Sequence, residues 1–146
     1  MNRLATINKV LHLKERREEE IELEVRALRN DIAVKQMRLS SLEGAYTETL
    51  EEFRRKQAGG TLASQEMMIY QGYLFHLQME MDSRKADIAR ALASLDARHG
   101  ALVEAHKETR VVEALKDRRT RENLKEELRK ERKEMDSIFT MRQGKS

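Results

Sequence analysis

The chain has 146 residues, of which 39% are hydrophobic and 38% charged, with three Tyr, three Phe and no Pro, Trp or Cys. So few large apolar side chains exclude a compact enzyme-like core, and the absence of cysteine excludes disulfides and thiolate metal sites, so we expect a coiled coil in a reducing cytoplasm. The 29 basic and 26 acidic residues are interspersed and give a net charge of +3, so no extended basic face indicates nucleic acid.

The first predicted helix covers about residues 2–57 and carries a sustained heptad repeat. Its a and d positions are mainly apolar, with Lys14, Glu18, Lys35 and Thr49 as the exceptions. Eleven are apolar: Leu4, Ile7, Leu11, Ile21, Val25, Leu28, Ile32, Leu39, Leu42, Tyr46 and Phe53. Such a repeat with charged flanks predicts a left-handed coiled coil rather than an isolated amphipathic helix.

A turn is predicted at about residues 58–63, because Gly59-Gly60 is the one paired glycine in the chain. A second helix is then expected at about residues 64–141, capped by the hydroxyl of Ser64 or, alternatively, of Thr61. Its apolar residues continue the three- and four-residue spacing: Met67, Tyr70, Leu74, Leu77, Met81, Ile88, Leu92, Leu95 and Leu102.

If the chain reverses at Gly59-Gly60, antiparallel partners have numbers that sum to about 120. Ile32 then faces Ile88, and Leu28 lies near Leu92, so two independently identified seams meet. We therefore predict an all-α fold: a long two-helix antiparallel coiled-coil hairpin, one domain over 1–146, and a monomer. The second helix extends beyond the first from about residue 118, and its stripe of Leu124, Leu128, Met135 and Ile138 is left for another molecule.

The densest aromatic segment is residues 67–81, just after the turn. Assigning Tyr70, Leu74, Leu77 and Met81 to the seam leaves Tyr73, Phe75 and Met79 partly outward. One interpretation is a wide core near the turn, and the other is a docking patch, because exposed aromatic and Met side chains often anchor protein interfaces.

No motif for catalysis is recognisable. The Gly59-Gly60-Thr61 segment lacks the Lys of a phosphate-binding loop, and a two-helix hairpin has no cavity in which carboxylates could be shielded from water. His12, His99 and His106 are more consistent with solvated side chains than with a metal site. We expect no enzymatic activity, no cofactor and no metal, and no apolar run approaches the ~18 residues of a membrane span.

The order of these segments resembles the FliJ family of flagellar type III export proteins. The resemblance rests on the Leu/Ile heptad helix, the glycine turn, the Tyr70-Gln71-Gly72-Tyr73-Leu74 segment and two charged stretches, 112–119 and 130–136. It implies a cytoplasmic coiled coil, peripherally associated with the inner membrane at the flagellar base, that promotes assembly and activity of the hexameric export ATPase. It also implies contacts with the export-gate membrane protein FlhA and with export chaperones.

The resemblance also suggests two binding sites. The gate site carries over to Tyr73, Leu77, Glu80 and Arg84, although Glu80 and Arg84 replace the small and His residues of the family. The ATPase-ring site is assigned to the extension beyond the hairpin, at Arg118, Arg119, Leu124, Leu128, Met135 and Ile138.

Two other functions remain open from the sequence. One is the equivalent stalk protein of a virulence injectisome. The other is a generic structural coiled coil or a weak nucleic-acid binder using Arg118, Arg119, Arg121, Arg129 and Arg132, although interleaved acidic residues would weaken phosphate binding.

Overall fold

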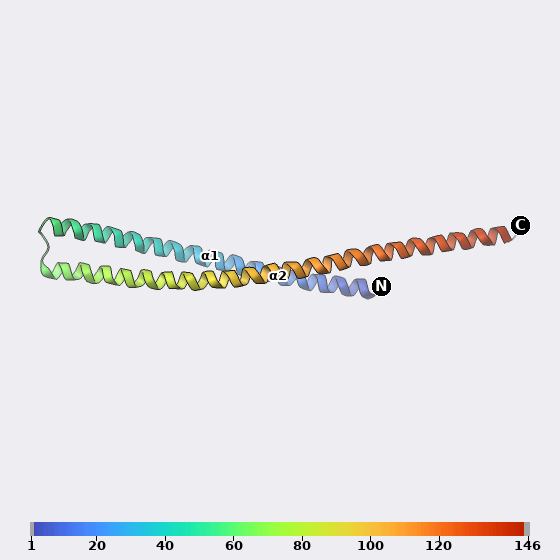
Figure 1. The fold of residues 1–146 in the computed structure, drawn as a ribbon, viewed down its shortest axis with the longest axis horizontal. Helices are drawn as coiled ribbons and strands as arrows, with labels where there is room; N and C mark the ends of the chain where they lie inside the picture. The colour runs from blue at the N-terminus through green and yellow to red at the C-terminus, as the bar shows by residue number, and fades with distance from the viewer. Residues whose placement is uncertain (1, 145–146) are drawn as a thin grey trace. The chain divides into compact units, whose positions relative to one another are not determined.

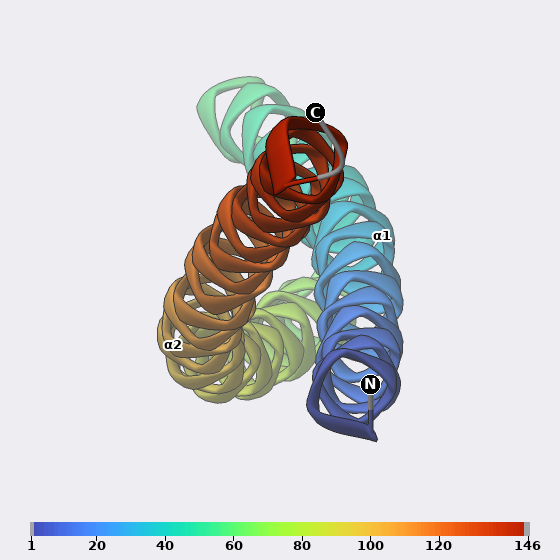
Figure 2. The same ribbon diagram turned by 90° about the vertical axis from the view of Figure 1, so that its right-hand side faces the viewer.

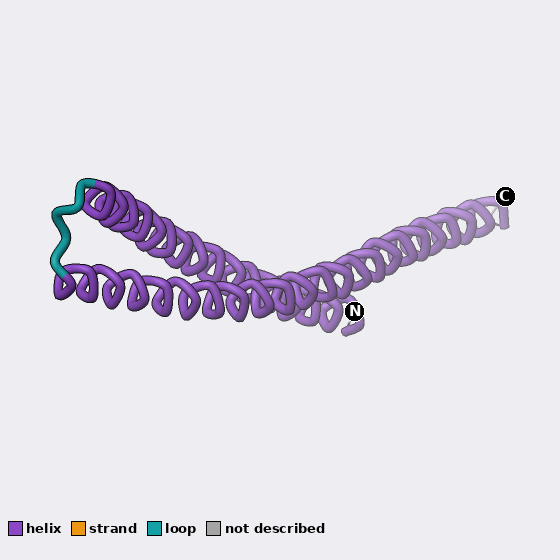
Figure 3. The backbone as a smooth tube through the Cα atoms, turned by 60° about the vertical axis from the view of Figure 1, so that its left-hand side comes forward, coloured by secondary structure: helices purple, strands orange, loops and turns teal. Residues whose placement is uncertain are grey.

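The fold is all-α in this computed structural model, which describes residues 2–144. Helix α1 spans Asn2–Ala58 and helix α2 spans Ser64–Gly144, and no strand occurs in the described range. A short loop joins the two helices, which pack antiparallel as a hairpin (Figures 1 and 3). The predicted fold is confirmed, and the helices end one and three residues later than predicted.

The heptad pattern of α1 accounts for its packing. Every predicted a and d position, apolar or polar, is buried or half-buried. With no proline to interrupt the backbone hydrogen bonds, the helix continues unbroken through 57 residues, and the buried pattern extends from Leu4 to Phe53.

The chain divides into two compact units. One, here called the hinge unit, is Glu22–Gly100, and the other, the terminal unit, combines Met1–Ile21 with Ala101–Ser146. Each unit contains one helical segment of α1 and one of α2, and each has its own core.

In the hinge unit, a single apolar seam lies between the helices. Its buried side chains are Val25, Ile32, Phe53, Leu77, Met81, Ile88 and Ala91. The Phe53 and Tyr70 rings lie 5.5 Å apart, and Glu24 forms an ion pair with Arg98 at 3.1 Å. These pairs have numbers that sum to 123 and 122, so the register is shifted by two to three residues from the predicted 120.

Leu92 is an exception to the predicted seam. It is 44% exposed, whereas Ala91 is buried. After Ile88, the heptad spacing of three and four residues leads to Ala91 and Leu95, so Leu92 lies beside the seam. The prediction that Leu92 belongs to the buried seam is therefore wrong.

The end of α1 is fixed by a Schellman motif. The amide of Thr61 donates to the carbonyl of Lys56, and the amide of Gly60 donates to that of Gln57, both at 3.3 Å. Gly60 has φ +66°, a left-handed conformation that favours glycine. This explains why the paired glycine predicted the turn correctly.

The predicted side-chain cap of α2 is wrong. Helix α2 begins at Ser64, and the first backbone bond of the helix goes from the amide of Met67 to the carbonyl of Ala63. Ala63 therefore occupies the capping position. The Thr61 hydroxyl instead donates to the carbonyl of Lys56 at 3.4 Å, at the end of α1.

The terminal unit has a smaller and more polar seam. Its buried residues are Leu11, Ile21, Ala105, Thr109 and Val112. Between them, Lys14 pairs with Glu108 at 2.9 Å and Glu18 contacts His106 at 2.6 Å.

Beyond the seam of the terminal unit, α2 continues alone. Arg119 and Asn123 are the last half-buried residues, and from Leu124 to Gly144 every residue is exposed. This segment, here called the overhang, is continuous with the preceding helix (Figure 2) and passes the end of the α1 segment in the same unit (Figure 1). The predicted extension is confirmed, starting about six residues later than expected.

Candidate partner-binding surfaces

The residues of the predicted gate site lie along one side of α2 in the hinge unit. Tyr73 is 48% exposed, and Glu80 and Arg84 are half-buried. Leu77 is only 4% exposed and belongs to the core, so on the closed hairpin it cannot contact a partner. Three of the four residues are thus accessible, and Leu77 lies in the core of the hinge unit.

Helix α1 contributes to the same surface. A shallow groove between the helices is lined by Arg38, Ser41 and Leu42 of α1 and by Glu80 and Arg84 of α2. The sequence analysis missed the α1 residues. The antiparallel register could have found them, because a sum of 122 pairs Arg38 with Arg84 and Leu42 with Glu80.

A second exposed strip lies on the opposite side of the same part of α2. Met68, Phe75 and Met79 are 56–70% exposed and are spaced by seven and four residues, so they share one face of the helix. The prediction that Tyr73, Phe75 and Met79 are partly outward is confirmed.

Near the turn, Tyr70 joins the two helices through its ring and hydroxyl. The Nζ of Lys56 donates to the Tyr70 Oη at 2.9 Å and lies 5.3 Å from the ring centroid. This hydrogen bond raises the pKa of Lys56 above its ordinary value of 10.5. The positive charge of Lys56 lies in the last turn of α1, where the carbonyl groups of the helix end favour it.

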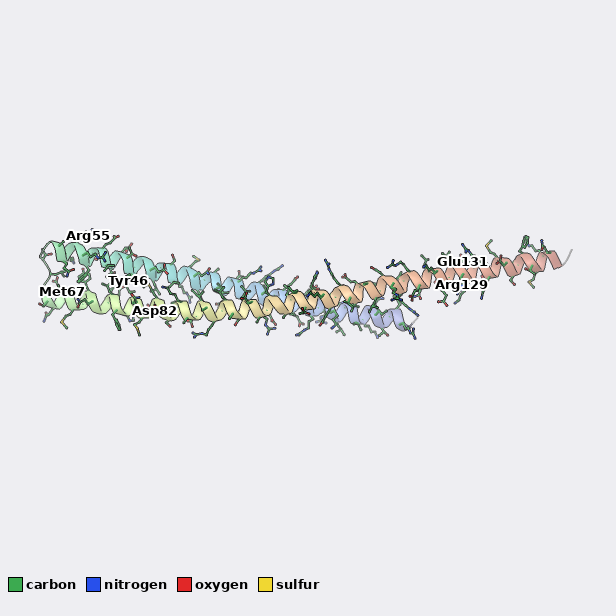
Figure 4. All side chains as sticks on the ribbon, viewed as in Figure 1. Tyr46, Arg55, Met67, Asp82, Arg129 and Glu131 are labelled. Carbon is green, nitrogen blue, oxygen red and sulfur yellow. The ribbon has the colours of Figure 1, made fainter. Side chains whose placement is uncertain are left out.

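The overhang carries most of the residues assigned to the ATPase-ring site. Leu124, Leu128, Met135 and Ile138 are 51–72% exposed along one stripe. Arg118 and Arg119 come just before the overhang, and both pair with Glu122, at 3.3 and 3.5 Å. Figure 4 labels Arg129 and Glu131 on the overhang, where no side chain from α1 in the same unit lies beside them.

Most charges of the overhang form no ion pair with a described residue. Arg118 pairs with Glu122 just before the overhang, whereas Lys130 pairs with neither Glu126 nor Glu134. Over residues 2–144, no hydrogen bond or ion pair involves Lys125, Arg129, Arg132, Glu127 or Glu134. These charges are free to interact with another molecule.

Two of the histidines each contact a single glutamate. Nδ1 of His106 contacts Oε1 of Glu18, and Nε2 of His76 lies 3.7 Å from Oε1 of Glu80. The described residues contain no group of three His, Cys, Asp or Glu that could hold a metal ion. Within the same range, neither helix has a stretch apolar enough to cross a membrane.

Comparison with known protein families assigns the chain to a family. The family model described as the flagellar FliJ protein matches residues 3–146, nearly the whole chain. The chain belongs to the FliJ family. No match was found among curated proteins or among solved structures.

Membership of the FliJ family makes the chain a component of flagellar type III protein export. The match covers both surfaces described above, the groove at Glu80 and Arg84 and the overhang. A FliJ protein is a structural component of the export apparatus, so exposed surfaces are where its function is expected to lie.

Proposed function

We propose that this FliJ-family chain binds the flagellar export ATPase through the overhang and promotes assembly and activity of its hexameric ring. The observation that carries the proposal is an apolar stripe of four exposed large side chains on a helix without an intrachain partner, in a chain whose family serves flagellar export. Such a stripe in water favours association with another protein. Arg118 and Arg119 border the site at the end of the seam.

The hinge unit supports a second interaction, with the export gate protein FlhA. Tyr73 is an exposed aromatic that the seam does not need, and it lies on the same side of α2 as Glu80 and Arg84. The groove adds Arg38 and Leu42 from α1. We assign gate binding to this composite surface, with Leu77 as the core residue that holds Tyr73 in position.

The strip of Met68, Phe75 and Met79 is available for the export chaperones. Methionine side chains adapt to different apolar partners, which suits a surface that receives more than one chaperone. We propose that the protein acts as a monomer in the cytoplasm and associates with the inner membrane at the flagellar base through its partners.

The alternative functions are less well supported. The family model is described as flagellar, which favours the flagellum over a virulence injectisome. Nucleic-acid binding is disfavoured because Arg118 and Arg119 are both engaged by Glu122 and because acidic residues flank the other arginines.

The ATPase interaction can be tested with the purified export ATPase of the same organism. The steady-state rate of ATP hydrolysis is measured against the concentration of this protein. The wild type is expected to raise the rate, and Leu128→Arg with Met135→Arg to abolish the increase, because two charges interrupt the apolar stripe.

A matched control is Val111→Arg with Leu115→Arg, which changes two residues that are 61% and 50% exposed on the hairpin portion of the same unit. This variant should stimulate like the wild type. Stimulation that survives the Leu128 and Met135 changes would contradict the assignment of the site, and an ATPase unaffected by the wild type would contradict the proposed function.

A further inference from the structure

The apolar stripe of the overhang lies on the opposite side of α2 from its seam with α1. In the terminal unit, the residues of α2 that face α1 are Ala105, Thr109, Val112, Lys116, Arg119 and Asn123, spaced by four and three residues. The same spacing continues to Glu126, Lys130, Lys133 and Ser137, all polar. At about 100° per residue, the stripe of Leu124, Leu128, Met135 and Ile138 lies roughly 150° around the helix from these four polar positions.

Because the seam and the stripe point in different directions around α2, an extension of α1 could not cover the stripe. An α1 helix extended along its existing path would meet the polar side, with Glu126 and Lys130, and would leave Leu128 uncovered. The stripe is therefore not an unfinished part of the hairpin, and its partner is a separate surface that approaches from the other side.

The charges beside the stripe are sorted by sign. Taking Leu128 and Met135 as a positions, the e positions on one flank are Arg118, Lys125 and Arg132, all basic, followed by Phe139 near the end of the helix. The g positions on the other flank include Glu127 and Glu134, both acidic. We call these flanks the basic rail (Arg118, Lys125, Arg132) and the acidic rail (Glu127, Glu134).

Four of the five rail residues are available for a partner. Lys125, Arg132, Glu127 and Glu134 form no ion pair with any described residue, whereas Arg118 pairs with Glu122 at 3.3 Å. A shallow hollow on the basic side is lined by Lys125, Leu128, Arg129 and Arg132, together with Glu122 and Glu126. Within the stripe itself, Glu131 takes the d position between Leu128 and Met135.

A second copy of the chain fits this pattern poorly. In a parallel pair, Glu131 would face the Glu131 of the other copy in the seam, and two opposed carboxylates are destabilising there. In an antiparallel pair, like rails would meet, basic against basic and acidic against acidic. The charge pattern therefore favours a different protein, rather than a second copy of this chain, as the partner of the overhang.

From this charge pattern we infer that the overhang is bound by a protein helix with an apolar ridge, acidic groups facing Lys125 and Arg132, and basic groups facing Glu127, Glu134 and Glu131. This inference rests on the proposed function, which makes the export ATPase the protein that carries this helix. It adds the orientation: the sorted rails favour one direction of the partner helix, since reversing it would pair like charges.

The test compares two charge reversals of equal size on the full-length protein. Lys125→Glu with Arg132→Glu reverses the basic rail, and Lys130→Glu with Lys133→Glu makes the same change in net charge on the polar side. The probe is the purified export ATPase, and the readouts are the concentration for half-maximal stimulation and its dependence on salt.

Reversal of the basic rail should raise the half-maximal concentration about fivefold or more, the order expected for two interfacial charges. It should also reduce the weakening that the wild type undergoes between about 0.05 and 0.3 M salt, because screening acts on the paired charges. Reversal at Lys130 and Lys133 should leave both readouts near the wild type. Far-UV circular dichroism checks that both variants remain helical.

Equal losses in the two variants would overturn the inference, since bulk charge would then explain the effect. Unchanged stimulation in the rail variant would also overturn it, while leaving the proposed function intact. If the wild type itself does not stimulate the ATPase, the proposed function fails. Co-sedimentation of the wild type with vesicles of anionic phospholipid, lost in the rail variant, would overturn the assignment to a protein helix in favour of a membrane surface.

Discussion

At the scale of single residues, neighbouring positions on one helix have opposite roles. Ile32 is 5% exposed in the seam of the hinge unit, whereas Val34, two residues later, is 47% exposed. Because α-helical positions two apart point to different sides, only the first contributes to the core. This contrast allows the seam to be tested with closely matched substitutions.

Ile32→Asp should be among the most destabilising single changes in the chain. It removes buried apolar surface and places an unpaired carboxylate in the seam, so we expect a loss of at least about 3 kcal/mol in the free energy of unfolding. Urea unfolding followed by circular dichroism measures it. The control Val34→Asp should change the free energy of unfolding by less than about 0.5 kcal/mol, and comparable losses in the two variants would argue against the register.

Tyr73→Ala should weaken binding to the cytoplasmic domain of FlhA by about tenfold or more, the usual effect of removing an aromatic anchor. The melting temperature should barely change, because the Tyr73 side chain is largely outside the core. Titration calorimetry gives the affinity. Met79→Ala, which removes an exposed side chain from the other strip, should bind FlhA normally.

Leu77→Ala should give a different result from Tyr73→Ala, with a clear loss of stability as well as weaker binding. If the Tyr73→Ala variant binds FlhA with unchanged affinity, or if the variant unfolds, residues 67–81 have only a structural role.

At the scale of whole elements, the two seams differ in polarity. The hinge unit has seven buried apolar side chains in its seam, whereas the terminal unit has four, with Thr109 buried among them. Glu18 occupies a heptad a position and its side chain is only 17% exposed, held by the contact with His106. The His106 side chain is 53% exposed, so the pair is only partly buried, and a carboxylate held in the seam in this way contributes less to stability than packed apolar side chains.

Glu18→Leu should therefore stabilise the protein, by about 1 kcal/mol. Leucine at this a position would pack in the seam of the terminal unit and remove the need to desolvate a carboxylate. Thermal unfolding measures the effect, with Glu19→Leu, at an exposed position, as the control. A decrease in melting temperature for Glu18→Leu would indicate that the contact with His106 is a net source of stability.

The sequence predicts the elements well because the heptad repeat and the glycine turn are local signals. The a and d positions of α1 could be read from spacing, and the start of α2 near Ser64 from the position of the glycine turn, although the side-chain cap expected there is not present. The register was displaced because the length of the turn depends on the Schellman motif at Gly60, which the sequence does not specify. Leu92 was misplaced because Ala91 and Leu92 both suit a helix, and only packing decides between them.

The candidate surfaces were predictable only in part. Tyr73 and the overhang stripe follow from helix periodicity. The burial of Leu77 and the contribution of Arg38 and Leu42 depend on the antiparallel partner, so they required the packed pair of helices. The shift in phase between the seam and the stripe became recognisable once Lys116, Arg119 and Asn123 were found to follow the seam.

At the scale of the whole molecule, both hairpin seams are satisfied within one chain, and the overhang charges disfavour self-association. We therefore expect a monomer of 17.1 kDa in sedimentation equilibrium. A mass near twice that value would contradict the monomer, and a return to the single mass when Leu128→Arg is introduced would also contradict the assignment of the overhang stripe to a different protein.

The central claim is that this FliJ-family protein supports flagellar export through its overhang, and secretion by the living cell tests it most directly. In a strain that lacks the gene, the amount of filament protein in the culture supernatant is measured after complementation with each variant. We predict a strong decrease in the deletion strain, restored by the wild type and by Val111→Arg with Leu115→Arg, and not by Leu128→Arg with Met135→Arg. Normal secretion in the deletion strain, or full restoration by the Leu128 and Met135 variant, would contradict the account.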